Sequence, residues 1–309
     1  MKRLLIAASF LVASSLTVSA RADEYEVSVA ENIPATSAEV LIIEQPLGKL
    51  SVSGWDKPTV KIVARKHAPD GATLDRLKVQ VEIRDGKIRV KTGVRVGNTF
   101  RTLPTAGGAG AGPGIDLTID APRRVQLHAS TWSGDLEAAG FRSGADLETR
   151  GGGEVVARDI EGRVRTSALK GRQRLSAIHG DVEADGVTGD VELTSIDGET
   201  LDAHVVDGQI TAREVRTPVV RLLSTSGGVI FIGTLRAGGR YELTSMDGDV
   251  RMQLRRAPFT LEARGRKVSS GFPVRGGIAT ATALSGEFQG GGPSLVLTAA
   301  HGAVAVDPF

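Results

Sequence analysis

The sequence predicts an all-β fold in which short strands and glycine-rich corners stack as a β-solenoid, or parallel β-helix. Three observations lead there: glycines return at a regular interval, apolar residues follow them at a fixed distance, and the turn sequences repeat. The chain has 309 residues with 39 Gly, no Cys and 40% hydrophobic residues, so it can bury a core without disulfides. No period of three accompanies the glycines, which excludes a collagen-like chain.

The glycine interval is nine residues from Gly144 to Gly198 and ten from there to Gly208. Short stretches of alternating apolar and polar residues follow, which is typical of a strand with one buried face. We expect the apolar residue two places after a glycine to point into the core. These positions are Leu136, Val155, Val164, Val182, Val191, Ile210, Val229, Tyr241, Val250, Phe288 and Val304. One such unit cannot hide its apolar face alone, so the units have to stack.

The turns repeat as well. Residues 193–198, Leu-Thr-Ser-Ile-Asp-Gly, recur as Leu-Thr-Ser-Met-Asp-Gly at 243–248. Asp-Gly and Ser-Gly suit a corner because glycine accepts a positive φ and the preceding side chain bonds to nearby backbone groups. The intervals between the strongest turns correspond to two or three of the repeating units, so we expect mostly two strands per coil with occasional three.

The amino-terminal third repeats less clearly but is also rich in predicted strands. These are residues 40–43, 50–52, 60–63, 79–83 and 88–90, with Asp85-Gly86 as the turn between the last two. We predict that residues 23–121 form opening coils or a cap, with a separate small β-domain as the alternative, and that residues 122–309 form the repeat region. The Gly/Ala/Pro stretch 104–114 is expected to be a flexible loop. Residues 254–280 break the interval and predict an irregular coil or side loop.

Residues 1–22 predict a signal peptide. Lys2 and Arg3 precede a largely apolar stretch that ends at Val18, and the small residues Ala20 and Ala22 suit cleavage by a signal peptidase. A retained membrane anchor is the alternative, although the apolar stretch is shorter than the ~20 residues of a spanning helix. Cleavage removes three basic residues and no acidic one, which lowers the formal net charge from +2 to −1. The mature chain is therefore expected to have no transmembrane segment and to bind no nucleic acid.

A family resemblance rests on Gly54-Trp55-Asp56, the alternating Val and Ile residues after it, and the repeated Thr-Ser-x-Asp/Ser-Gly-Asp-Val units. Over residues 39–306 the chain resembles the bacterial putative-adhesin domain family, whose function is unassigned. The resemblance implies a β-solenoid exported to the cell envelope or surface and brings no catalytic residues. The stretches 104–114 and 254–280 depart from the simple repeat.

Metal and cofactor chemistry find little support in the sequence. Calcium-binding β-rolls need an acidic residue after the corner glycines, but Arg163 and Arg172 stand there between acidic corners such as Asp181. The histidines show no metal-ligand spacing, and they are His67, His128, His179, His204 and His301. We therefore expect no metal site and no cofactor.

The favoured functional hypothesis is an exported, non-catalytic protein that uses one long, flat face of outward side chains for binding or structural contacts. The predicted contacts are Trp132, Glu183, Glu192, Arg221, Glu242 and Arg251. Polysaccharide, extracellular matrix or an envelope protein is the expected partner, in the periplasm, on the outer cell surface or outside the cell. Trp132 lies in a turn, where it either contacts a ligand or caps a coil. A purely structural envelope scaffold fits the sequence equally well.

The alternative is a β-helical enzyme that cleaves polysaccharides. Glycoside hydrolysis needs two carboxyl groups roughly 5–9.5 Å apart. Asp181, Asp190, Asp197 and Asp207 would supply them if they met on one edge of the fold. Acidic residues are also expected at these corners from turn preference alone, and aromatic residues are only 4% of the chain, so the sequence favours a protein without catalytic activity.

Overall fold

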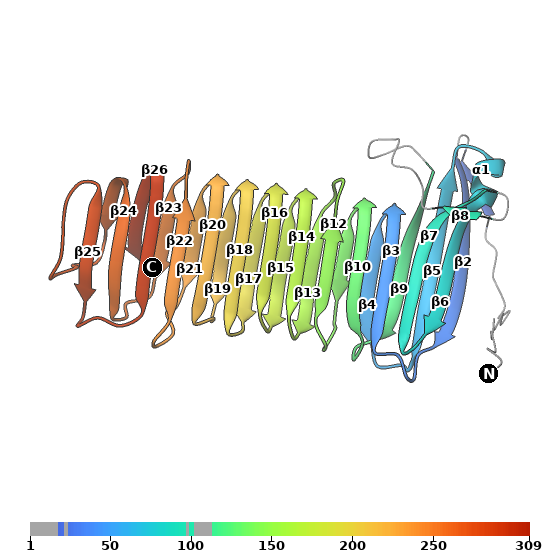
Figure 1. The fold of residues 1–309 in the computed structure, drawn as a ribbon, viewed down its shortest axis with the longest axis horizontal. Helices are drawn as coiled ribbons and strands as arrows, with labels where there is room; N and C mark the ends of the chain where they lie inside the picture. Colours follow the sequence, from blue (N-terminus) through green and yellow to red (C-terminus); the bar gives the residue numbers. More distant parts are fainter. Residues whose placement is uncertain (1–17, 22–23, 97–98, 102–112) are drawn as a thin grey trace, which may run out of the picture.

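The computed structural model describes residues 18–21, 24–96, 99–101 and 113–309, and it shows a long rod of β-strands (Figure 1). The fold is all-β apart from one short helix, and most of its strands pair in parallel. Of the predicted signal peptide, only Val18–Arg21 lies among the described residues, as strand β1. The predicted loop 104–114 lies outside them except for residues 113 and 114, and Gly114 begins strand β9.

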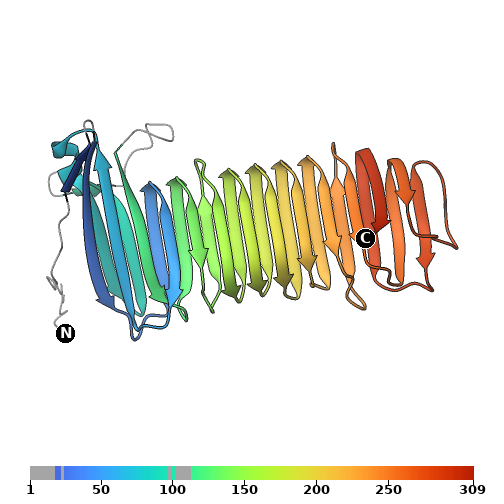
Figure 2. The ribbon, with the colours of Figure 1, turned by 180° about the vertical axis from the view of Figure 1, so that it is seen from behind.

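Between Gln126 and Leu254, a stretch that is fully described, each strand pairs in parallel with the strand two places further along the chain. The strands therefore form two ladders that run together along the rod (Figures 1 and 2). The first ladder contains β10 (Gln126–Ser133), β12 (Ala145–Thr149), β14 (Val164–Lys170), β16 (Val182–Thr188), β18 (Thr200–Asp207), β20 (Val219–Ser226) and β22 (Arg240–Ser245). The second ladder contains β11 (Leu136–Ala139), β13 (Val155–Glu161), β15 (Gln173–His179), β17 (Val191–Asp197), β19 (Ile210–Val215), β21 (Val229–Gly233) and β23 (Val250–Leu254).

The register explains the interval seen in the sequence. Val164 lies opposite Val182, and Val182 opposite Leu201, so neighbouring strands of one ladder are separated by two repeating units. Each nine- or ten-residue unit is one strand, and successive units alternate between the ladders. The pairing of every second strand has no exception from β10 to β23, so the longer intervals between strong turn motifs do not mark a third strand.

The core lies between the two ladders. Every predicted core position, from Leu136 to Val304, is buried with at most 5% of its surface exposed, which confirms the prediction. Like residues stack in columns, such as Ile160, Ile178 and Ile196 of the second ladder. One continuous apolar core includes buried residues from Ile33 to Val306 and so joins the amino-terminal third to the repeat region.

Two columns of glycine form the corners. In one column Gly153, Gly171 and Gly189 stand directly above one another, and a Cβ atom on either of the last two would overlap the carbonyl oxygen of the glycine before it. The other column includes Gly162 and Gly180 at the opposite ends of the strands. Because the chain passes through both columns between one strand of a ladder and the next, glycine returns twice in that interval.

The amino-terminal end continues both ladders and then ends in antiparallel pairs. Its elements are β2 (Glu24–Pro34), β3 (Val40–Leu47), β4 (Leu50–Trp55), β5 (Thr59–Ala68), α1 (Gly71–Arg76), β6 (Leu77–Arg84), β7 (Lys87–Val96), β8 (Thr99–Arg101) and β9 (Gly114–Pro122). β3 lies between β7 and β10, and β4 lies between β9 and β11, all in parallel. The outermost pairs, β6 with β7 and β2 with β5, are antiparallel. All five strands predicted here are present.

Local sequence accounts for two further features of this end. Asp85 and Gly86 have φ of 50° and 72°, the two positive values of a two-residue hairpin turn, as predicted. Helix α1 was not predicted. Its signal is Asp70, whose carboxylate accepts a hydrogen bond from the Thr73 backbone N–H at 2.7 Å and so caps the first turn.

At the carboxyl-terminal end the order of strands in space differs from their order in the sequence. β26 (Ser294–Pro308) lies between the pair β22 and β23 on one side and β24 (Phe259–Ser270) on the other, and β25 (Ala283–Phe288) covers β24 (Figure 1). The prediction of an irregular segment over 254–280 is therefore wrong for 259–270, which forms one strand with a single shift of register between Gly265 and Lys267. The interval breaks because the neighbour of β23 in space comes from the end of the chain. Phe259, Phe272 and Phe288 pack together and cover the end of the core.

Candidate functional site

Outward residues of the first ladder form a charged row along the rod. Strand register brings these side chains into line, and they are His128, Asp146, Arg165, Glu183, Asp202, Arg221 and Glu242. Glu183 accepts hydrogen bonds from Arg165 at 2.7 Å and Arg163 at 3.0 Å. The bond from Arg165 holds the pKa of the Glu183 carboxyl below its ordinary value, since it favours the charged form. Arg221 lies 3.8 Å from Asp202, so each of these arginines pairs with an acidic neighbour, although the acidic Glu183 and Asp202 lie side by side.

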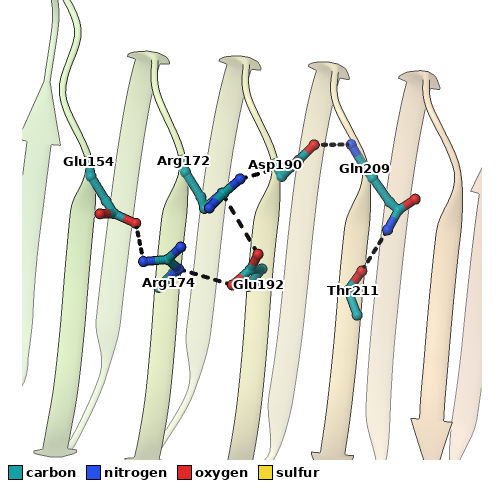
Figure 3. A network of polar contacts seen from close by, with 7 residues as sticks. All are labelled: Glu154, Arg172, Arg174, Asp190, Glu192, Gln209 and Thr211. Atoms are coloured by element: carbon teal, nitrogen blue, oxygen red, sulfur yellow. Dashed lines mark hydrogen bonds and ion pairs between the residues drawn. The ribbon is translucent and has the colours of Figure 1, made fainter.

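The second ladder has its own ion-pair network near the start of its strands (Figure 3). Arg174 contacts Glu154 on one neighbouring strand at 2.7 Å and Glu192 on the other at 3.0 Å. Arg172 lies 3.7 Å from Glu192 and 4.0 Å from Asp190. The network thus connects β13, β15 and β17, and each charged side chain in it forms an ion pair with an oppositely charged neighbour within the rod.

The structure divides the predicted contact residues between two faces, so the prediction of a single face is wrong. Glu183, Arg221 and Glu242 lie on the first ladder, whereas Glu192 and Arg251 lie on the second. The division follows from the alternation of nine-residue units between the ladders. Most of these charged side chains have a partner on a neighbouring strand, and the remaining two pair along their own strand, Glu242 with Arg240 at 3.9 Å and Arg251 with Asp249 at 3.5 Å.

An apolar row runs beside the charged row on the first ladder, and the sequence analysis did not anticipate it. Its members are Trp132, Leu169, Val187, Val206 and Met246, which are between 39% and 49% exposed. Leu169, Val187 and Val206 lie side by side on three successive strands. The residues immediately before and after each of them are register partners of the corresponding residues on the next strand. Arg150 and Thr225 interrupt the row. The sequence does contain a signal for this row, because an apolar residue recurs just before the corner of every second unit. That recurrence can be recognised only once the register between the strands is known.

Trp132 stands at the amino-terminal end of this apolar row, beside an open groove of about 680 Å³. Ala129 and Ser130 are among its small lining residues, and Pro46 lies on the strand next to Trp132. Glu148 on the next strand and Arg150 just after it also line the groove, and Arg150 donates hydrogen bonds to Glu148 at 2.8 and 3.0 Å. The groove therefore combines an exposed indole with polar groups, as small-ligand sites commonly do.

The other tryptophan has a structural role. Trp55 donates its indole N–H to the carbonyl of Thr59 at 2.6 Å, across the corner between β4 and β5, and the ammonium of Lys57 lies 4.8 Å from its ring centre.

The four carboxyl groups considered for glycoside hydrolysis do not meet on one edge. Asp181 and Asp197 lie near the corners between second-ladder strands and the following first-ladder strands, whereas Asp190 and Asp207 lie at the opposite corners. Asp181 accepts the backbone N–H groups of Glu199 and Thr200 at 3.1 and 3.0 Å. Asp190 accepts that of Gln209 at 3.0 Å. These carboxylates thus stabilise the next corner, as turn preference predicts.

The described residues contain no group of His, Cys, Asp or Glu side chains able to hold a metal ion. Among those same residues, no helix has the length and apolar character needed to span a bilayer. No family model and no curated protein matches the sequence.

Solved structures similar to this chain include proteins named as putative adhesins. One from Parabacteroides merdae is 12% identical, with 90% of this chain and 95% of that chain covered and a TM-score of 0.45. One from Bacteroides fragilis is 8% identical, with 91% and 97% covered and a TM-score of 0.40. A structure from Parabacteroides distasonis named as a putative lipid binding protein is 9% identical, with 90% and 96% covered and a TM-score of 0.36.

Proposed function

We propose that this chain is an exported, adhesin-like, non-catalytic protein that binds a partner through the outer face of its first ladder. The signal-peptide pattern of residues 1–22 supports export to the periplasm, the outer cell surface or the medium. Strands that pair at a constant step of two repeating units support a β-solenoid with two strands per coil as the scaffold.

The observation that carries the proposal is the apolar row. Most charged side chains on the same face are satisfied by neighbours within the rod, whereas Leu169, Val187 and Val206 are left partly exposed side by side. A contiguous apolar strip with a polar border is typical of an interaction surface. With Trp132 at one end of it, the row offers a partner contacts that add along the rod. Polysaccharide, extracellular matrix and envelope protein are the partner classes that such a surface suits.

Retention of the purified mature protein on envelope fractions tests this proposal. Replacing Val187 and Val206 with Ser should weaken retention by about tenfold, because the loss of apolar burial at two positions is worth roughly 1.4 kcal/mol. The matched control replaces Val156 and Ile230, two half-buried residues in outward positions of the second ladder, with Ser. Equal weakening by both double variants, or no retention of the wild-type protein, would rule out a first-ladder binding face.

The role of Trp132 has a separate readout. A Trp55→Phe variant leaves Trp132 as the only tryptophan, so its emission reports on the groove alone. We expect a shift in that emission when the retained partner is added, and reduced retention of a Trp132→Ala variant. An unchanged spectrum during full retention would assign Trp132 to coil capping instead.

A further inference from the structure

A second hollow, separate from the groove at Trp132, lies on the second ladder where β19, β21 and β23 end. Its volume is about 570 Å³. Charged lining residues include Arg213, Arg216 and Arg255, and apolar ones include Ile232 and Phe309.

The backbone explains why the hollow is there. Four successive strands of the second ladder, β13 to β19, each contain one residue more near their carboxyl end than the strand that follows them, β21. These extra residues have φ of 52° to 56°, and they are Asp159, Ala177, Ser195 and Glu214. The next strand, β21, lacks this residue, so the register shifts between Arg213 and Val215. Gly233 then lies opposite Val215, and a Cβ there would press on the ring of Phe231 at 3.1 Å. The surface therefore steps down where the row of extra residues ends.

The same register brings the arginines close together where the row of extra residues ends. Val215, Gly233 and Leu254 lie opposite one another, so the residues that follow them, Arg216, Thr234 and Arg255, come from the same position of three neighbouring strands. Two strand spacings, about 9.6 Å, separate the backbones of the outer two. Arg213 stands three residues before Arg216 on the other side of the extra residue Glu214.

The charge of these arginines is not neutralised within the rod. Across the part of the chain that the structure describes, none of the three makes an ion pair, whereas Arg163 and Arg174 of the repeat region both do. Two acidic groups line the hollow. Asp197 pairs with Arg236 at 3.3 Å, whereas Glu214 accepts a hydrogen bond from the neutral hydroxyl of Ser195 at 2.6 Å and keeps its negative charge. Three arginines therefore stand against one carboxylate that has no ion-pair partner, which leaves an excess of positive charge at the hollow.

We propose that this second-ladder hollow is a binding site separate from the first-ladder face and that it binds the carboxylate or sulfate groups of an acidic polysaccharide. Guanidinium groups bind such oxyanions through paired, charge-assisted hydrogen bonds. Arginines set two strands apart can reach anionic groups on successive sugars of one chain. Ile232 and Phe309 offer apolar surface to the sugar rings between those groups.

Affinity of the mature protein for polygalacturonate at low salt tests the inference. Replacing Arg213, Arg216 and Arg255 together with Gln should weaken binding by at least about tenfold, because several charge-assisted bonds are lost. The matched control replaces Arg84, Arg142 and Arg264, which are exposed and lie elsewhere, with Gln and so changes the net charge equally. The control should bind within about twofold of wild type, and thermal melting confirms that both variants are folded.

Further arms identify the source of the anion. Galacturonic acid alone should bind far more weakly than the polymer, and neutral dextran should not bind. Equal weakening by the control triple variant, equally tight binding of duplex DNA, or no binding of any acidic polysaccharide would overturn the inference. The Val187/Val206 variant should bind polygalacturonate as tightly as the wild type does, and an equal loss of that binding in both variants would overturn the inference.

Discussion

At the scale of single residues, the corner glycines have a steric function as well as a conformational one. Gly189 has a φ of 129°, which side-chain-bearing residues rarely adopt, and its missing side chain lets the carbonyl of Gly171 approach. The same holds for Gly171 above Gly153. The repeat of glycine in the sequence is therefore a requirement of close stacking between successive corners.

Replacing Gly189 with Ala should destabilise the fold by roughly 2 kcal/mol or more, since it combines backbone strain with a clash against a carbonyl group. Urea denaturation measures this change. Gly71→Ala is the control, because Gly71 begins helix α1 and a Cβ there meets nothing within 4 Å. A Gly189→Ala variant as stable as the control would contradict the stacking argument.

The corner aspartates were predictable as turn residues, but their partners were not. Asp135, Asp181 and Asp190 each follow a corner glycine, and each accepts a backbone N–H from the next corner of the stack. Sequence alone indicates that an acid is suited to such a corner. Which N–H it meets depends on the register between strands that lie two units apart in the chain, and a local pattern does not contain that information.

At the scale of strands, alternation predicted inward side chains well and outward ones poorly. The inward positions are fixed by burial, so every apolar residue predicted two places after a corner glycine is found in the core. The outward rows arise from pairing between strands, and this is why the charged residues split between two ladders and the apolar row was missed. Strand β24 was missed for a related reason, because its neighbour β26 is distant in sequence.

The pairing of β14 with β16 predicts a pH dependence. Hydrogen bonding to Arg165 lowers the pKa of Glu183 from its ordinary value of 4.5, so the stabilisation is present above pH 4.5 and is lost as the pH falls through the folded-state pKa. Glu183→Gln should therefore lower the melting temperature slightly at pH 7, by an effect equivalent to about 0.2–1 kcal/mol, and this difference should shrink as the pH is lowered through the folded-state pKa. A difference that stayed constant throughout an acid titration would point to packing rather than charge.

At the scale of the whole molecule, the end of the chain is built into the rod rather than added to it. β26 pairs in parallel with β22 and β23 on one side and with β24 on the other. Residues Leu295, Leu297 and Val304 of this strand are buried in the common core. The rod is therefore incomplete at this end until the last residues of the chain have been placed.

Hydrogen exchange should show this directly. Amides of residues 295–299 and 304–306 are expected to exchange about as slowly as those of β16 and β18, because both sides of the strand are paired there. β25, which covers β24 at the edge, should exchange faster. Mass spectrometry of peptides from a deuterium-labelled sample measures both. Fast exchange in both of the doubly paired segments would show that β26 is not an integral part of the sheet.

Local sequence patterns were sufficient to predict the all-β class, the repeating strand-and-corner unit, the inward apolar positions and the glycine corners, because each depends on residues close together in the chain. Three features could be recognised only in the folded molecule: the two-strand alternation expected for most of the chain holds without exception from β10 to β23, β26 is inserted among earlier strands, and Leu169, Val187 and Val206, or Arg213, Arg216 and Arg255, meet on one surface. Those features depend on register between distant strands, which backbone hydrogen bonds and core packing select together, and a period in one sequence does not specify it.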